Sequence, residues 1–257
     1  MNKIQNAFRR KAFIAFLTAG DPDFNTSVEN IMAAVRAGAD LIEIGIPFSD
    51  PIAEGPVIQE ANIRALSAGM TTDRAFLLAE EVRKRTEIPI CFMTYLNPVF
   101  HYGYDRFFQK CGEIGIDGLI CPDLPYEEKN EVADVAEKYG IDVISLIAPT
   151  SEERIKTIAE NAKGFLYIVS SMGVTGERSE IKTDLSAIMD TVKKYAKIPA
   201  AIGFGINTPE QAEKMASLAD GVIVGSAIVK LAKKYGKDAP QKIYEYVKSM
   251  TDGMKRA

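Results

Sequence analysis

The groups that could do chemistry in this chain are mainly carboxylates. The 257 residues include one histidine, His101, and three cysteines, Cys91, Cys111 and Cys121. No two cysteines have CxxC spacing, so they predict reduced core residues and neither a disulfide framework nor a zinc site. A single histidine leaves little basis for a metal site or a Ser-His-Asp triad, and we expect His101 to lie at the surface in a loop. Acid–base chemistry would then depend on Asp, Glu, Tyr or Lys.

Glu43 is the carboxylate whose position points most directly to function. Strand alternation within residues 41–46 places three isoleucines on one face and Glu43 on the other. The isoleucine face should meet helices, so Glu43 should point into the interior. Burial raises the pKa of a carboxyl group toward the range of a general acid or base, which favours catalysis over a structural ion pair. The next loop holds Asp50 and Glu54 among prolines; spacing alone favours solvated charge for Asp50 and leaves Glu54 open.

Three segments have the composition of loops that bind anions or close over ligands. Residues 170–179 combine glycines with small hydroxyl side chains, which suits a lid, an anion cradle or an ordinary flexible loop. Residues 203–207 and 225–227 are glycine-rich ends of apolar runs. Backbone N–H groups at such glycines can approach a phosphate, and a helix beginning at Ser226 would direct its N-terminus toward it. We therefore expect a phosphate ester as substrate.

A regular alternation of strands and helices must position these residues. Gly-x-Asp recurs at 38–40, 115–117 and 140–142, with Ala219-Asp220 as a variant, and a short apolar run follows each time. Glycine commonly ends a helix, and an unbroken apolar run is typical of a buried parallel strand. The eight predicted strands are 12–17, 41–44, 88–93, 118–121, 143–146, 165–169, 198–202 and 221–224.

Helices are predicted between these strands by apolar residues at i, i+3, i+4 and i+7. The stretches are 28–35, 75–82, 132–139, 155–162 and 185–192, and a sixth begins at the capping sequence Thr208-Pro209-Glu210-Gln211. Eight alternations without a long linker favour a (β/α)₈ TIM barrel of the α/β class, with an extra N-terminal helix, as a single domain over residues 1–257. Six or seven units could also form an open sheet. In the barrel, the site lies at the C-terminal ends of the strands.

Composition argues against several classes of protein. Lys and Arg total 31 and Asp and Glu 35, so the net charge of −4 provides no basic face for nucleic acid and no polybasic run for a membrane. The apolar runs are short and interrupted, and the first ten residues lack the apolar core of a signal peptide. We expect a cytoplasmic protein.

The motif around Glu43 resembles the tryptophan synthase alpha chain family. The residues that carry the resemblance are Glu43-Ile44-Gly45-Ile46-Pro47-Phe48-Ser49-Asp50-Pro51 with Gly55-Pro56 and Gln59, Phe16-Leu17-Thr18-Ala19-Gly20-Asp21-Pro22, Thr94-Tyr95-Leu96-Asn97-Pro98, Gly173-Val174-Thr175-Gly176, Gly203-Phe204-Gly205 and Gly225-Ser226-Ala227-Ile228-Val229-Lys230. The resemblance implies a (β/α)₈ lyase that cleaves indole-3-glycerol phosphate to indole and glyceraldehyde 3-phosphate. It implies no metal and no cofactor of this chain's own. The implied partner is a pyridoxal-phosphate β subunit, which receives the indole in an α₂β₂ complex.

The resemblance also implies roles for single residues. Glu43 matches the catalytic glutamate that moves protons at indole C3 and the glycerol hydroxyl, and Glu54 matches the second catalytic acid, which holds the indole N–H. The implied substrate-binding residues are Phe16, Met93, Cys121, Tyr167, Thr175 and Phe204, and the implied phosphate-binding residues are Gly176, Gly205, Gly225 and Ser226. Pro47 and Asp50 match the surface that faces the β subunit.

Position 54 departs from the family pattern, in which the second acid is more commonly aspartate. Glu54 is one methylene longer and follows a flexible segment, 50–53. We expect its carboxylate to reach the indole N–H and Thr175 only when the site is closed, and to point toward solvent when no ligand is bound.

Other functions remain open on the sequence alone. An isomerase or epimerase of sugar phosphates would also explain the glycine loops and Glu43, but not the proline-rich loop that follows it. A barrel kept only as an activator of a β subunit would not need a carboxylate in its interior. A stand-alone lyase that releases free indole is compatible with the sequence, and an indole-release assay with and without a β subunit separates these functions.

Overall fold

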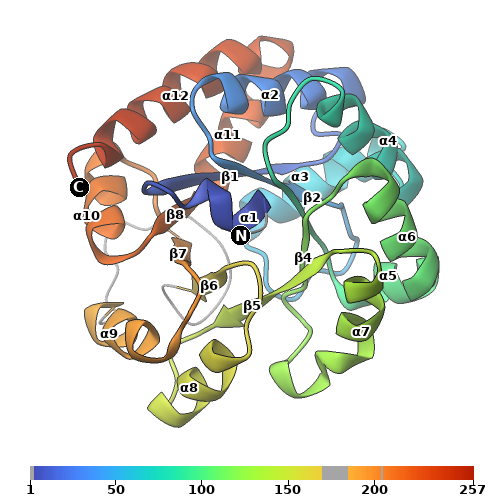
Figure 1. Cartoon of the computed structure of the whole chain (residues 1–257). Helices are drawn as coiled ribbons and strands as arrows, with labels where there is room; N and C mark the ends of the chain where they lie inside the picture. Colours follow the sequence, from blue (N-terminus) through green and yellow to red (C-terminus); the bar gives the residue numbers. More distant parts are fainter. Residues whose placement is uncertain (1–2, 170–184, 204) are drawn as a thin grey trace.

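The computed structural model of the protein describes residues 3–169, 185–203 and 205–257. Within these residues eight parallel strands form a closed barrel, in which each strand pairs with its neighbours in the chain and β8 closes against β1 (Figure 1). The strands are β1 (Ala12–Thr18), β2 (Leu41–Gly45), β3 (Ile90–Met93), β4 (Gly118–Ile120), β5 (Asp142–Ile147), β6 (Leu166–Val169), β7 (Ala200–Gly203) and β8 (Gly221–Val224). The predicted (β/α)₈ barrel is confirmed, and the strand ends differ from those expected by at most two residues.

Helices surround the barrel on all sides. Their bounds are α1 (Lys3–Ala7), α2 (Phe24–Arg36), α3 (Pro56–Ser67), α4 (Thr72–Arg83), α5 (Leu96–Tyr102), α6 (Tyr104–Ile114), α7 (Asn130–Lys138), α8 (Glu152–Glu160), α9 (Leu185–Tyr195), α10 (Pro209–Leu218), α11 (Ser226–Tyr235) and α12 (Ala239–Met254). The six helices predicted from periodicity are α2, α4, α7, α8, α9 and α10. His101 is exposed as expected, but it lies in α5 and not in a loop. With seven residues, α5 is too short for a repeated apolar period.

Two apolar layers divide the structure at the sheet. Ile42 and Ile44 of β2 belong to the layer between strands and helices, whereas Leu41 belongs to a separate cluster inside the barrel. This division is the one that strand alternation predicts. The extra N-terminal helix α1 lies across the centre of the barrel in Figure 1, and its residue Ile4 joins the interior cluster with 1% exposure. Helix α1 therefore covers the end of the barrel where the strands begin.

The recurring aspartates at the starts of strands join neighbouring strands. Three of the four donate the backbone N–H to the carbonyl of a residue on the preceding strand and accept that residue's N–H on the carboxylate, whereas Asp142 donates its N–H to the Asp117 carbonyl at 3.1 Å. The pairs are Asp40 with Phe13, Asp117 with Ile90 and Asp220 with Ala200, and all six bonds measure 2.8–3.0 Å. The carboxylate thus satisfies a strand N–H that lies beyond the end of the regular ladder.

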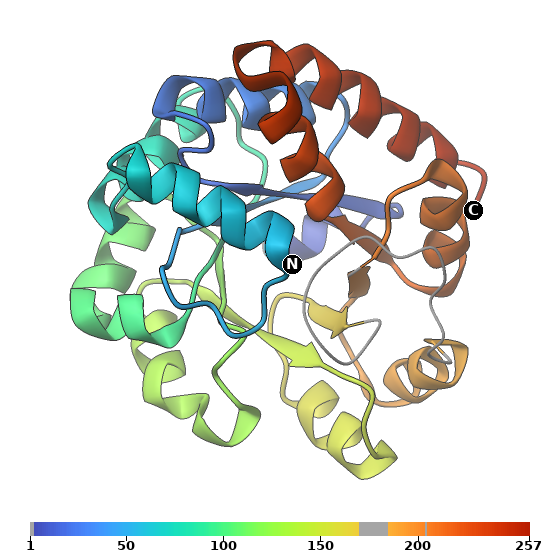
Figure 2. The same ribbon diagram turned by 180° about the vertical axis from the view of Figure 1, so that it is seen from behind.

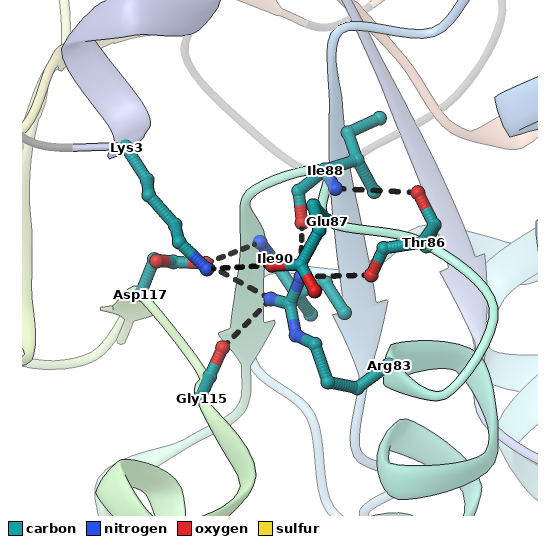
Figure 3. A network of polar contacts seen from close by, with 8 residues as sticks. All are labelled: Lys3, Arg83, Thr86, Glu87, Ile88, Ile90, Gly115 and Asp117. Carbon is teal, nitrogen blue, oxygen red and sulfur yellow. Dashed lines mark hydrogen bonds and ion pairs between the residues drawn. The ribbon is translucent and has the colours of Figure 1, made fainter.

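Asp117 also holds Arg83, at the end of α4 (Figure 3). The guanidinium donates to Asp117 at 3.1 Å and to the backbone carbonyls of Thr86, Ile88 and Gly115 at 3.2, 2.7 and 2.7 Å. Nearby, Lys3 of α1 pairs with the loop residue Glu87 at 3.2 Å. The side chains of Arg83 and Asp117 are only 13% and 15% exposed, so this pair is shielded from water. Among the described residues, no helix has the length and apolar character needed to cross a membrane.

Two matched substitutions test how much the Arg83 contact adds to a strand-joining aspartate. Asp220→Ala removes only the acceptor of the Ala200 N–H, and we expect it to lower the free energy of unfolding by about 1–3 kcal/mol. Asp117→Ala also leaves the Arg83 guanidinium without its carboxylate partner, and we expect the free energy of unfolding to fall by about 3–5 kcal/mol. Urea unfolding, with midpoints and slopes compared, measures both losses. Equal losses would show that the ion pair contributes nothing beyond the N–H bond.

Candidate active site

A cavity of about 230 Å³ lies at the end of the barrel where the strands finish, the end shown in Figure 2. Residues from β1, β2, β3, β5, β6 and β8 and from the following loops line it. The residues are Phe16, Glu43, Ala53, Glu54, Ile58, Met93, Pro122, Leu146, Ala148, Tyr167, Val169, Gly205, Ile206, Ile223, Gly225 and Ser226. The structure therefore brings eight of the sequence-predicted site residues together in this central cavity.

Glu43 is fully buried at the inner end of the central cavity. Its strand neighbours are Phe16 on β1 and Cys91 on β3. Neither carboxylate oxygen has a hydrogen-bond partner among the described residues, and burial alone raises the pKa of Glu43 to about 8. Burial, and to a lesser extent the charged form of Glu43, raises the pKa of Tyr167, which lines the same cavity. At neutral pH Glu43 is thus a protonated acid that can both give and take a proton.

Glu54 faces the same cavity from the loop between β2 and α3. Its Oε2 accepts a hydrogen bond from Asn62 Nδ2 at 2.7 Å, and the Tyr95 hydroxyl bonds to the carboxylate as well. Burial raises the pKa of Glu54 to about 7, while these two donors oppose that rise. The expectation that Glu54 points toward solvent without ligand was wrong. Asn62 on α3 and Tyr95 after β3 hold it inward.

Glycines on neighbouring strands make room for the two aromatic rings of the cavity. A Cβ atom at Gly45 would lie 2.6 Å from Phe16 Cζ, and one at Gly225 would lie 3.2 Å from Phe16 Cδ1. Likewise, a Cβ at Gly203 would lie 2.6 Å from the Tyr167 hydroxyl oxygen. These glycines therefore have a packing role that the sequence did not reveal.

The polar end of the cavity is formed by backbone. Gly205, with φ +80°, and Gly225 lie on its wall, and Ser226 is the first residue of the ten-residue helix α11. The N-terminal turn of a helix presents unpaired N–H groups and the positive end of the helix dipole, which together attract anions. The arrangement suits a phosphate group. Thr175, Gly176 and Phe204, the other expected contacts, lie outside the described residues.

Cys121 was expected in the indole pocket, but it does not line the central cavity. Ile120 points into the barrel, so alternation turns Cys121 outward into the layer below the helices, where its Sγ lies 3.2 Å from Asp123 Oδ1. The next residue, Pro122, lines the cavity instead. The pocket position after β4 was therefore assigned to the residue before the one that lines the cavity.

The two residues expected to face a partner differ in exposure. Asp50 is exposed at the tip of the loop after β2, whereas Pro47 is buried. The sequence analysis did not single out Asn62 or assign a role to Tyr95. Asn62 could have been noticed as a polar residue on the otherwise apolar face of α3 that carries Ile58, Ala61 and Ala65. Among the described residues, no cluster of three or more His, Cys, Asp or Glu side chains could hold a metal ion.

Comparison with known proteins identifies the family that the chain matches. The family model for the tryptophan synthase alpha chain matches residues 3–257. The chain is 53% identical to a tryptophan synthase alpha chain of Lacticaseibacillus casei over 251 residues, which are 97% of this chain and 94% of the relative. It also resembles tryptophan synthase subunit alpha of Legionella pneumophila (40% identity, TM-score 0.91, all of both chains) and a chain of the tryptophan synthase complex of Pyrococcus furiosus (34% identity, TM-score 0.88, 95% and 98% of the chains).

The buried state of Glu43 predicts a characteristic pH dependence of stability. The pKa of Glu43 is about 8 in the folded state, above the 4.5 of an exposed glutamate. Protonation of Glu43 therefore stabilises the folded state fully below pH 4.5, and this stabilisation is lost as the pH rises to about 8. Glu43→Gln, which stays neutral, should therefore gain stability relative to the unsubstituted protein between pH 5 and pH 8, by at most about 1.4 kcal/mol per pH unit.

Urea unfolding at both ends of this pH range measures the effect. The same substitution at the exposed Glu153 is the control for removal of one charge. If the difference between Glu43→Gln and the unsubstituted protein is equal at both pH values, Glu43 is ionised throughout.

Proposed function

The chain belongs to the tryptophan synthase alpha chain family, and we propose that the central cavity is where it carries out the carbon–carbon lyase reaction of that family, on indole-3-glycerol phosphate. The enzyme thus takes part in tryptophan biosynthesis. The observation that carries the proposal is a pair of buried carboxyl groups in one cavity that differ in hydrogen bonding: among the described residues Glu43 has no donor, and Glu54 has two.

The environments of the two carboxyl groups assign their roles. Glu43 donates its proton to C3 of the indole ring, and the ring nitrogen carries the positive charge that develops. Glu54, whose donors favour its charged form, accepts the indole N–H and stabilises that charge. The bond between C3 and the glycerol carbon then breaks, and its electron pair returns to the ring. The glycerol hydroxyl loses its proton to the Glu43 carboxylate as its C–O bond becomes the aldehyde carbonyl, so Glu43 ends protonated as it began.

The remaining walls of the cavity suit the two ends of this substrate. Phe16, Met93 and Leu146 offer an apolar surface to the indole ring. The backbone of Gly225 and the first turn of α11 lie where the phosphate group would be held. Phosphate esters of this kind are cytoplasmic metabolites, and we place the reaction in that compartment.

A pyridoxal-phosphate-dependent β subunit is the proposed partner, and indole is the product passed to it. The cofactor belongs to that subunit, and this chain's residues supply acid–base chemistry only. The loop after β2 supports the assignment, because Ile52 is 73% exposed between the exposed Asp50 and the cavity residue Glu54. A partner that covers this loop would remove the Ile52 side chain from water, which favours association.

Indole release from indole-3-glycerol phosphate, measured with and without a β subunit, tests the proposed function. We expect Glu43→Gln to lower kcat by about 10²–10⁴-fold, because an amide cannot exchange the proton. Glu54→Ala should also lower kcat strongly with little change in phosphate affinity, and Glu54→Asp should retain substantial activity. Full activity of Glu43→Gln would rule out the acid–base role, and no indole release by the unsubstituted chain, alone or with the β subunit, would favour a non-catalytic activator.

The proposed phosphate position is tested separately at Gly225. Gly225→Asp should raise KM for the substrate at least tenfold, because a carboxylate beside the first turn of α11 repels the phosphate group. Gly225→Ala is the control for bulk alone, since the three atoms nearest to its Cβ all belong to the Phe16 side chain, the first at 3.2 Å. Equal KM values for the two variants would place the phosphate elsewhere.

A further inference from the structure

A second cavity, of about 320 Å³, lies beside the central one and has no part in the proposed reaction. Three wall residues, Pro122, Leu146 and Ala148, are common to both cavities. The outer cavity lies near the ends of β4 and β5, in the part of Figure 1 where α7 and α8 cover the barrel. Its other lining residues are Cys121, Leu124, Pro125, Tyr126, Lys129, Val143, Ile144, Ser145, Pro149, Thr150, Arg154 and Ile158.

A polar pair interrupts the apolar layer at this cavity. Ser145 lies on the outward face of β5 between Val143 and Ile147, which both pack in the layer under the helices. Its side chain is almost fully buried, with 7% of the residue exposed. Lys129, just before α7, donates from Nζ to the Ser145 hydroxyl at 2.9 Å. A serine and a lysine thus meet where the alternation of the strand would place an apolar contact.

Lys129 differs from the two other cations near this cavity in lacking a counter-ion. Arg154 forms an ion pair with Glu127 through both guanidinium nitrogens, and Lys163 pairs with Glu137 at 2.7 Å. Within the described part of the chain, no carboxylate lies within 4.0 Å of the Lys129 ammonium. Its only hydrogen bond there is to a neutral hydroxyl, that of Ser145.

The surroundings of Lys129 make its charge costly. Burial, with a smaller effect from the charge of Lys163, lowers the pKa of Lys129 from 10.5 to about 8, although Asp142 at the start of β5 acts in the opposite direction. Arg154 and Glu127 at the edge of the cavity largely neutralise each other. Among the described residues, the cavity lining therefore has one cation, Lys129, that no carboxylate within 4.0 Å neutralises.

We propose that the outer cavity binds a small organic carboxylate, with its carboxylate group on the Lys129 ammonium and the Ser145 hydroxyl. The apolar part of the ligand lies against Leu124, Val143 and Ile158, which line the same cavity. Inorganic phosphate suits the site less well, because a dianion needs more donors than Lys129 and Ser145 provide, and Arg154 is already paired with Glu127. A carboxylate group supplies one negative charge to Lys129, and the apolar part of the same ligand can contact the apolar lining residues.

Binding of a carboxylate is coupled to the proton on Lys129. An anion in contact with the ammonium favours the charged form and raises the pKa of Lys129 from about 8 toward its ordinary value. Binding near pH 8 therefore takes up a proton. Above that pH the neutral amine predominates, so affinity falls as the pH increases.

The test uses the full-length chain labelled with ¹³C and ¹⁵N, with benzoate as the probe and the Lys129 Nζ resonance as the readout. Benzoate should shift this resonance and raise its titration midpoint by about one pH unit or more, equivalent to a tenfold preference for the charged form. Inorganic phosphate at the same concentration should have a much smaller effect. No shift with benzoate up to about 50 mM, a concentration that detects even millimolar affinity, would overturn the proposal, and so would an equal or larger shift with phosphate.

Two substitutions and a control test whether benzoate binds in the outer cavity. Saturation-transfer NMR signals of benzoate measure its affinity for each variant. Lys129→Met should weaken binding at least about tenfold, and Ser145→Val should do the same by filling the cavity. Lys163→Met removes a neighbouring charge outside the lining and should leave affinity within about threefold. Equal binding by Lys129→Met and the unsubstituted chain would place the benzoate elsewhere. None of these measurements uses the lyase reaction, so their outcome is independent of the proposed function.

Discussion

Exclusion of water from the Glu43 carboxyl group is the physical constraint on which the site depends. A closed barrel sends every second strand residue inward, and the interior around Glu43 is filled with apolar side chains. Ionisation there has neither water nor donors from the described residues to support it, which keeps the proton on the carboxyl group at neutral pH. A glutamate with an ordinary pKa would have no proton to give. The fold therefore determines the acidity of the group as well as its position.

The shape of the central cavity depends on glycines that make room for two aromatic rings. Phe16 occupies the space that side chains at Gly45 and Gly225 would need, and Tyr167 does the same at Gly203. A Cβ atom at Gly45 or Gly203 would lie 2.6 Å from one of these aromatic side chains, so a side chain there would displace part of the cavity wall. Gly225 also has no side chain to cover the start of α11. Glycine thus makes room for aromatic rings at the apolar end of the cavity and exposes backbone N–H groups at the polar end.

The two ends of the barrel differ in how their polar groups are used. At the end where strands begin, aspartates satisfy the N–H groups of adjacent strands, Arg83 joins four acceptors, and Ile4 of α1 fills the interior. At the opposite end, Glu43 and Lys129 lack partners of opposite charge among the described residues, and each faces a cavity. Polar groups that satisfy the strand backbone and polar groups that face cavities thus lie at opposite ends of the barrel, as is usual for this fold.

The sequence by itself determined the eight strands, six of the helices and the inward direction of Glu43, because those features follow from periods of two and 3.6 within short segments. Tertiary structure alone decided the direction of Glu54, which depends on Asn62 and Tyr95, and the use of Pro122 in place of Cys121 in the cavity wall. Alternation predicts a side chain's direction only while the strand continues. Past its last residue, contacts between segments that are distant in the sequence take over, and no local pattern records them.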